Sequence, residues 1–287
     1  MMNEENVLPI GFGRSTREEE RPLALRWSAR TDVGRFRKNN EDSFLALVIN
    51  PMGVRFLGKE GDSDEVGCDY IFAVSDGMGG AKSGEFASRI AVDKITKLLP
   101  QSFRVEASNL ATGRTEVVNE VFHRVHEEME KMGFHYEECR GMGATLSLGW
   151  FSAGWLHFGH IGDSRIYYLP KDGEVKQLSH DHTFAGSQRR KGKLNERQAR
   201  NHPQKNMLTQ VLGAGRRSVD PQLGAVKIEH GDRFLFCSDG LVDGIWDHAI
   251  ADALKDWELP TLADRLVTTA VQASGRDNTT AVVVEVA

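Results

Sequence analysis

The stretch Tyr70-Ile71-Phe72-Ala73-Val74-Ser75-Asp76-Gly77 is apolar over the length of a strand and ends on a carboxylate and a glycine. The same pattern returns in Arg233-Phe234-Leu235-Phe236-Cys237-Ser238-Asp239-Gly240. A strand that is buried on both faces of a sheet has this continuous apolar character. The aspartate then lies at the rim of the core within reach of water, and the glycine lets the backbone turn sharply. The two stretches therefore predict buried strands that present a pair of aspartates suited to hard cations.

Helices and shorter strands are predicted around these two stretches. Apolar residues recur at helical spacing over Ser83–Leu99, where Pro100 is expected to end the helix, and over Arg114–Met132. Alternation of apolar and polar residues from Leu146 to Leu169 is typical of antiparallel hairpins with one buried face. The remaining predicted elements are strands over Leu23–Thr31, Ser43–Ile49, near Val226 and over Thr279–Val286, a loop or hairpin over Pro51–Gly67, and a helical region Ala249–Ala273 split near Pro260. The order predicts an α+β domain with helices covering antiparallel sheets.

Composition limits the class of protein. The chain has 287 residues, 40 % apolar and 27 % charged, which suits one large domain or two small ones with a sizeable core. A net charge of −5 argues against a dedicated nucleic-acid binder. Three cysteines without a C-x-x-C pair fit a reducing compartment. Without an apolar span or a secretory signal in the sequence, we expect a cytoplasmic protein with no membrane partner.

Residues 1–22 are polar and aperiodic, and we expect a flexible tail before a single domain over 23–287.

Acidic residues stand at several strand ends. The pairs are Asp76-Gly77, Asp163-Ser164, Asp239-Gly240 and Asp277-Asn278, with Glu41-Asp42 opening a further strand. Oxygen ligands of this kind select Mg²⁺, Mn²⁺ or Ca²⁺ over zinc. Any one pair alone is more often a simple turn, but five at the ends of apolar runs favour a metal site.

Several other catalytic patterns fail on inspection of the sequence. The run Gly53 to Lys59 resembles a P-loop, but Glu60 stands where Ser or Thr should bind magnesium. The sequence contains neither an H-E-x-x-H motif nor a G-x-S-x-G elbow. Cys237 is not followed by the arginine of a cysteine-based phosphatase loop.

An ordered series of motifs covers about residues 23–286. Its main members are Arg30-Thr31-Asp32-Val33-Gly34-Arg35-Phe36-Arg37-Lys38-Asn39-Asn40-Glu41-Asp42, Asp76-Gly77-Met78-Gly79-Gly80, Gly143-Ala144-Thr145, Gly159-His160-Ile161-Gly162-Asp163-Ser164-Arg165, Ser238-Asp239-Gly240-Leu241 and Gly275-Arg276-Asp277-Asn278-Thr279-Thr280. In this order they resemble the metal-dependent Ser/Thr protein phosphatase family of the 2C type, in its bacterial form. The resemblance implies a four-layer α-β-β-α sandwich of two antiparallel sheets flanked by helices, with a small flap over about 183–206.

The resemblance also implies a site. Asp76 would bridge two Mn²⁺ or Mg²⁺ ions, the Gly77 carbonyl would complete one, and Asp239 and Asp277 the other. Asp163 would hold a third, weaker ion together with Asp239. Further expected site residues, acting through metal-bound waters or on the phosphate, are Glu41, Asp42 and Arg37.

The implied activity is hydrolysis of phosphoserine and phosphothreonine in proteins by a hydroxide shared between two ions, opposing bacterial Ser/Thr kinases. Arg37 can grip two phosphate oxygens with its planar fork. Some members of the family carry a histidine as general acid at one of two positions. This chain has Met78 at the first of these positions and Ala81 at the second. A metal-bound water, His160 or His182 are then the alternatives.

Two further interpretations stay open at this point. The same fold could serve as a catalytically silent regulator that binds phosphoproteins, or as a calcium-binding structural domain. In the expected flap, the basic residues outnumber Glu196; six of them are Arg189, Arg190, Lys191, Lys193, Arg197 and Arg200. This segment reads first as a solvated helix pair, and alternatively as a surface that attracts acidic phosphopeptides.

Overall fold

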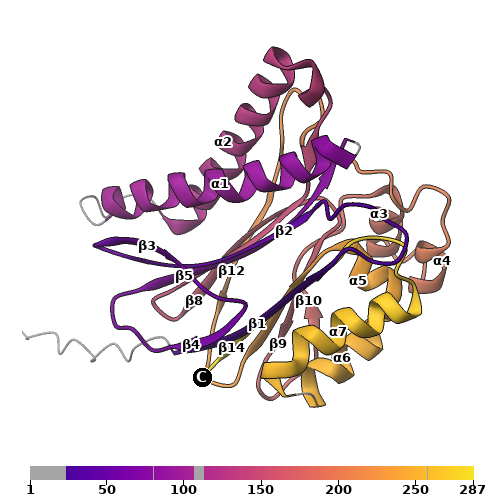
Figure 1. Ribbon diagram of the computed structural model, residues 1–287. Helices are drawn as coiled ribbons and strands as arrows, with labels where there is room; N and C mark the ends of the chain where they lie inside the picture. The colour runs from indigo at the N-terminus through magenta and orange to yellow at the C-terminus, as the bar shows by residue number, and fades with distance from the viewer. Residues whose placement is uncertain (1–23, 80, 107–112, 257) are drawn as a thin grey trace, which may run out of the picture.

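The two apolar stretches lie in different antiparallel sheets. Residues 70–77 belong to strand β5 (Asp69–Met78), and the second stretch contains strand β13 (Arg233–Cys237). Figure 1 shows the sheets face to face with helices on both outer sides, in a computed structural model that describes residues 24–79, 81–106, 113–256 and 258–287. The expected N-terminal tail, 1–22, lies outside the described residues. The predicted α+β sandwich of two antiparallel sheets flanked by helices is confirmed.

Within the described residues, one sheet has six strands in the order β10-β9-β13-β14-β1-β4. These strands are β10 (Lys176–Gln177), β9 (Arg165–Leu169), β13, β14 (Thr279–Val286), β1 (Leu25–Asp32) and β4 (Glu60–Ser63). Strand β14 thus pairs with β1 on one side, with Leu25 opposite Val286, and with β13 on the other. The last strand of the chain therefore joins its first and its later segments in one sheet.

The other sheet has eight strands in the described residues, in the order β11-β6-β5-β7-β8-β12, with β2 paired to β5 and β3 paired to β2. Its strands are β11 (Leu212–Gly213), β6 (Gly143–Ala144), β5, β7 (Leu146–Ser152), β8 (Trp155–Ile161), β12 (Gln222–Lys227), β2 (Asp42–Asn50) and β3 (Gly53–Phe56). Strand β5 lies between β2 and β7. This central position explains its continuous apolar sequence.

Side-chain alternation along the strands divides the core into layers. In β5, Ile71 packs toward the helices, while Phe72 packs between the sheets. Phe72, Phe151 and Phe234 then form a chain of edge-to-face rings, with centroid distances of 5.8 and 5.3 Å, that joins the two sheets. In β13, Leu235 points to the opposite outer layer. Both faces of each central strand are therefore buried, as the sequence predicts.

Helices cover the outer face of each sheet (Figure 1). Helices α1 (Ala81–Glu106) and α2 (Arg114–His135) pack on the eight-stranded sheet, and α5 (Asp239–Gly244), α6 (Asp247–Asp256) and α7 (Leu259–Ala273) pack on the other. The short elements α3 (Phe184–Arg190), α4 (Glu196–Arg200) and the 3₁₀ turn η1 (Glu137–Cys139) complete the helical segments that are described. None of the described helices combines the length and the apolar character needed to span a bilayer.

One detail differs from the sequence expectation and a second goes beyond it. Pro100 does not end the first helix, because α1 continues to Glu106. A proline inside a helix removes one backbone hydrogen bond, and the turns on either side can still hold the helical path. The segment 51–67, expected as a loop or hairpin, supplies β3 in a hairpin with β2, and also β4, which adds to the edge of β1.

Candidate active site

A cleft of about 460 Å³ gathers the acidic residues that the sequence singles out. All the predicted site residues except Asp42 line this cleft: Arg37, Glu41, Asp76, Gly77, Asp163, Asp239 and Asp277. They come from the loop before β2, the end of β5, the turn between β8 and β9, the start of α5 and the segment before β14. Residues more than 200 positions apart in the chain are thus brought together because the relevant ends of both sheets meet at this edge of the sandwich.

Asp76 is fixed by its neighbour Thr145. The Asp76 amide donates to the Thr145 hydroxyl at 3.0 Å, and the Thr145 amide donates back to the Asp76 carbonyl at 2.8 Å. The Ser75 hydroxyl donates to the Thr145 carbonyl at 2.7 Å. Thr145 also lines the cleft. Thr145 belongs to one of the sequence motifs, but no role could be predicted for it from the sequence. The structure shows that Thr145 positions the end of β5.

The loop that carries Arg37 and Glu41 is held by the buried side chain of Asn278. Its amide oxygen accepts from the Glu41 backbone at 2.8 Å, and its amide nitrogen donates to the carbonyls of Val33 and Asn39 at 2.9 and 3.0 Å. Asn278 follows directly after Asp277 in the chain, so one turn orients both the acidic side chain and the opposite loop. Only the motif position of Asn278 could have indicated this role from sequence.

Arg37 lies in direct contact with the carboxylates. Its Nη2 donates to Asp277 Oδ2 at 2.7 Å, and its Nη1 lies 3.8 Å from Glu41 Oε2. The hydrogen bond to Asp277 raises the pKa of the Arg37 guanidinium, against the opposing effect of burial. A permanent positive charge therefore stands at the edge of an acidic cleft.

Asp42 lies beneath the cleft rather than in its lining. Its Oδ2 accepts hydrogen bonds from the hydroxyls of Ser238 at 2.7 Å and Thr280 at 2.6 Å, while its Oδ1 is buried and has no hydrogen-bond partner among the described residues. Burial raises the pKa of Asp42 to about 6, and the two hydroxyl donors oppose that rise. Since Asp42 belongs to the eight-stranded sheet and its two donors to the other half of the sandwich, this carboxylate links both halves under the site.

The acidic cluster carries more negative charge than its surroundings balance. Burial, followed by repulsion from neighbouring carboxylates, raises the pKa of Asp76 and Asp239 well above the usual range. Burial and the nearby Asp181 raise the pKa of Asp163 to about 7. Asp239 Oδ1, like Asp42 Oδ1, is buried and accepts no hydrogen bond from the part of the chain that the structure describes. Buried charges of one sign need a counter-ion.

Hard divalent cations fit this donor set, because it consists of carboxylate and carbonyl oxygens without thiols or imidazoles. Across the described ranges, no three His, Cys, Asp or Glu side chains are grouped as a preformed metal cage. The fit therefore rests on donor chemistry, burial and uncompensated oxygen atoms. The assignment of individual ligands stays a prediction.

Gly77 lies where the backbones of β5 and α1 approach most closely. A Cβ added to Gly77 would be 1.9 Å from the Gly84 carbonyl oxygen, and the Gly77 amide donates to the Glu41 carbonyl at 3.1 Å. The absence of a side chain therefore allows the start of α1 to pack against the acidic edge of the sheet.

We expect Gly77→Ala to lower the free energy of unfolding by about 1–3 kcal/mol, because the clash involves backbone atoms that must shift. Urea denaturation of the two proteins measures the change. Gly58→Ala is the matched control, since its added Cβ meets nothing closer than 3.4 Å. Equal losses in both variants would contradict the packing argument.

The two histidines considered as general acids are structural. His160 is fully buried, with its ring nitrogens bonded to the Ser147 hydroxyl at 2.9 Å and to the Gly162 carbonyl at 3.1 Å. His182 Nδ1 accepts from the Gly162 amide at 3.2 Å. Burial lowers the pKa of His160 to about 3 and that of His182 to about 4. Neither lines the cleft, whereas Met78 does.

A buried arginine connects the expected flap to the domain. Arg165 donates to both carboxylate oxygens of Asp181, at 2.9 and 2.7 Å, and to Asp247 Oδ1 at 3.0 Å. Asp247 also accepts from Arg189 of α3 at 2.6 Å. Arg200 of α4 lies over the Trp246 ring at 4.2 Å. The short helices α3 and α4 agree with the helix-pair interpretation. At least three of the six basic side chains, those of Arg189, Arg190 and Arg200, contact the domain outside the expected flap.

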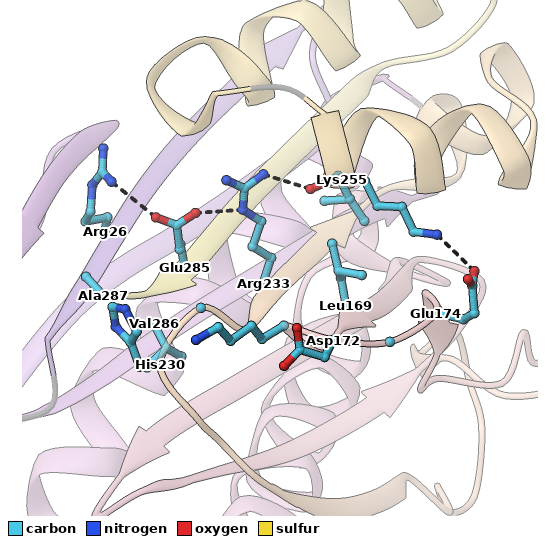
Figure 2. Close-up of a pocket in the computed structure, with 14 residues that line it drawn as sticks. Arg26, Leu169, Asp172, Glu174, His230, Arg233, Lys255, Glu285, Val286 and Ala287 are labelled. Carbon is cyan, nitrogen blue, oxygen red and sulfur yellow. Dashed lines mark hydrogen bonds and ion pairs between the residues drawn. The ribbon is translucent and has the colours of Figure 1, made fainter.

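A larger cavity, of about 840 Å³, lies at the opposite end of the six-stranded sheet (Figure 2). It contains the start of β13 at Arg233 and the end of β14 at Val286, whereas the cleft contains Asp239 and Asp277 at the other ends of these strands. Figure 2 shows that Glu285 lies between Arg26 and Arg233. The Glu285 carboxylate accepts hydrogen bonds from Arg26 at 3.2 Å and from Arg233 at 2.6 Å. The two arginines of this cavity thus share one carboxylate, and none of the predicted site residues lines it.

Fold and site together define the class of the protein. The family model of protein phosphatase 2C matches residues 61–280, and the chain belongs to this family. Among curated relatives, it is 34 % identical over 270 residues to the serine/threonine protein phosphatase PstP of Mycobacterium tuberculosis, covering 92 % of this chain and 45 % of that protein. It is 31 % identical over 259 residues to the serine/threonine phosphatase stp of Listeria monocytogenes, covering 89 % of this chain and 94 % of the relative.

Solved structures support the same assignment. The crystal structure of M. tuberculosis PstP superimposes with a TM-score of 0.74 at 31 % identity and covers 92 % of this chain and 99 % of that one. The PstP catalytic domain in complex with two manganese ions has a TM-score of 0.72 at 30 % identity and covers 92 % and 98 % of the two chains. The family resemblance seen in the motifs is therefore confirmed.

Proposed function

We propose that the protein hydrolyses phosphoserine and phosphothreonine in proteins with two Mn²⁺ or Mg²⁺ ions, and that a third ion binds more weakly. The observation that carries the proposal is the convergence of Asp76, Asp239, Asp277 and Glu41 on one cleft together with Arg37. Serine/threonine phosphatases among the relatives, and the two manganese ions of the PstP catalytic domain, support it.

Each residue has a physical role in this proposal. When bound, the cations lower the pKa of a water molecule and so provide a nucleophile near neutral pH. Asp76 and the Gly77 carbonyl would hold one ion, Asp76, Asp239 and Asp277 the other, and Asp163 with Asp239 the third. Glu41 and Asp42 would orient water from the side of the Arg37 loop. Arg37 would bind two phosphate oxygens and place the phosphorus in the cleft.

The expected substrates are phosphoproteins of a cytoplasmic Ser/Thr kinase system, which the enzyme would oppose. The net charge of −5 argues against nucleic acid as the partner.

Hydrolysis of p-nitrophenyl phosphate by the full chain tests the proposal. We expect turnover with Mn²⁺ or Mg²⁺ and its loss on adding excess EDTA, because the carboxylates alone cannot activate water. Turnover that persists in EDTA would require another mechanism. No turnover with either metal would favour a silent phosphoprotein-binding member of the family.

We expect Arg37→Lys to lower kcat/KM for a phosphothreonine peptide about 30-fold, since an ammonium cannot make the bidentate contact of a guanidinium. Steady-state kinetics with Mn²⁺ measures the change. The matched control is Arg55→Lys, an exposed arginine paired with Glu65 outside the cleft. An unchanged kcat/KM in Arg37→Lys would remove Arg37 from the phosphate site.

A further inference from the structure

Apolar side chains border the acidic cleft. Phe36 is 70 % exposed and Met78 is 39 % exposed, and both line the cleft together with Leu208. We refer to these three residues as the apolar rim. Single exposed apolar residues are ordinary, but a group of them around a polar cleft marks a surface that contacts a ligand.

Two residues of the apolar rim are sequence neighbours of residues that the proposed function assigns to phosphate or metal binding. Phe36 directly precedes Arg37, and Met78 directly follows Asp76 and Gly77. Any phosphorylated residue that reaches Arg37 and the carboxylates must therefore bring its neighbours in the peptide close to these two side chains.

The loop that presents Phe36 is anchored on both sides. The Arg35 amide donates to the Gly275 carbonyl at 2.7 Å, the Arg35 guanidinium donates to the Ser274 carbonyl at 2.7 Å, and Arg37 is bound to Asp277. The Arg35 guanidinium also lies 5.9 Å from the centre of the Phe36 ring. Phe36 is thus held toward solvent by its fixed neighbours, so its ring is preorganised for contact.

Leu208, the third residue of the apolar rim, is held by a different part of the chain. Leu208 forms a backbone bridge with Thr183, the residue that caps α3, and its carbonyl accepts from Arg216 Nη2 at 3.1 Å. The rim therefore consists of side chains on separately anchored segments that line the same cleft.

We propose that the apolar rim selects phosphoproteins in which a bulky apolar residue lies next to the phosphorylated serine or threonine. This inference rests on the proposed function. An apolar neighbour gains free energy when it is buried against Phe36 and Met78. A polar neighbour in the same place would lose water without gaining a hydrogen bond.

The experiment compares two phosphothreonine peptides that differ only in having Leu or Ser on both sides of the phosphothreonine. With the full chain and Mn²⁺, we expect kcat/KM to be about tenfold higher for the Leu peptide, the preference given by burial of about one leucine side chain. Phe36→Ser should remove most of this preference, and Phe36→Leu should retain it. Met78→Gln, which keeps the length of the side chain, should reduce it.

Phe134→Ser is the matched control, because Phe134 is an 84 % exposed phenylalanine on α2 outside the cleft lining. This variant should keep the wild-type preference. Equal kcat/KM for both peptides in the wild type, or a preference unchanged in both Phe36→Ser and Met78→Gln, would overturn the inference and leave the proposed function intact. Absence of metal-dependent hydrolysis of either peptide would instead overturn the proposed function. A concentration-dependent dimer that Phe36→Ser abolishes, without peptide preference, would assign the rim to self-association and overturn the inference.

Discussion

Replacing Asp239 with Asn is expected to lower kcat/KM for p-nitrophenyl phosphate in Mn²⁺ by about a thousandfold, the loss seen when a group that stabilises charge in the transition state is removed. Asp239 lies at the start of α5, and one of its carboxylate oxygens is buried with no hydrogen-bond partner in the described ranges. An amide cannot supply the missing charge to a cation. Steady-state kinetics across a Mn²⁺ titration measures the loss. Asp172→Asn is the control, since Asp172 lies in the cavity at the far end of the sheet.

In the absence of metal, Asp239→Asn is expected to increase the thermal stability of the protein. Asp239 is crowded by the carboxylates of Asp163 and Asp277, and removing one buried negative charge relieves that repulsion. In EDTA we expect Asp239→Asn to raise Tm by about 2–4 °C, equivalent to about 1 kcal/mol in a domain of this size. A lower Tm in EDTA would mean that Asp239 has a structural role, and the kinetic loss could then be a folding defect.

Replacing Arg165 with Met is expected to lower the free energy of unfolding by about 3–5 kcal/mol, because the buried carboxylate of Asp181 loses the guanidinium that pairs with it and Asp247 retains Arg189 alone of its two arginines. The Arg165 side chain is only 11 % exposed and contacts both carboxylates. Urea denaturation measures the loss. Asp181→Asn in the same background should recover part of the stability, since it removes the carboxylate that has lost its guanidinium.

Arg55→Met provides the comparison for Arg165. Arg55 pairs with Glu65 on the surface, where its side chain is 57 % exposed, and such a pair contributes less than about 1 kcal/mol. Similar losses in the two variants would show that the buried network contributes no more than an ordinary surface contact.

The central strands were predictable because a strand that is buried on both faces has a continuous apolar sequence. Tyr70 to Val74 and Phe234 to Cys237 form an uninterrupted apolar pattern, and the structure places them in the middle of their sheets. Strand β4 was not predictable, because Glu60, Gly61, Asp62 and Ser63 have little intrinsic strand preference and pair only with an edge that β1 offers. The predicted end of the first helix at Pro100 was wrong, because the low helix propensity of one residue does not by itself decide where a long helix ends.

The candidate site was predictable in its acidic residues but not in their supports. Aspartates at the ends of apolar runs can be found by inspection, and the fold brings them to one cleft. The contacts of Asp42 with Ser238 and Thr280, and of Asn278 with the Arg37 loop, join residues that are far apart in the chain. Such contacts depend on how the two sheets are packed, for which a single sequence carries no local signal.

The position of β14 between β1 and β13 has a consequence for biosynthesis. The six-stranded sheet cannot close, and Asp277 cannot join Asp76, until the ribosome has released residues 277–286. A nascent chain therefore has no assembled site until residues 277–286 have left the ribosome.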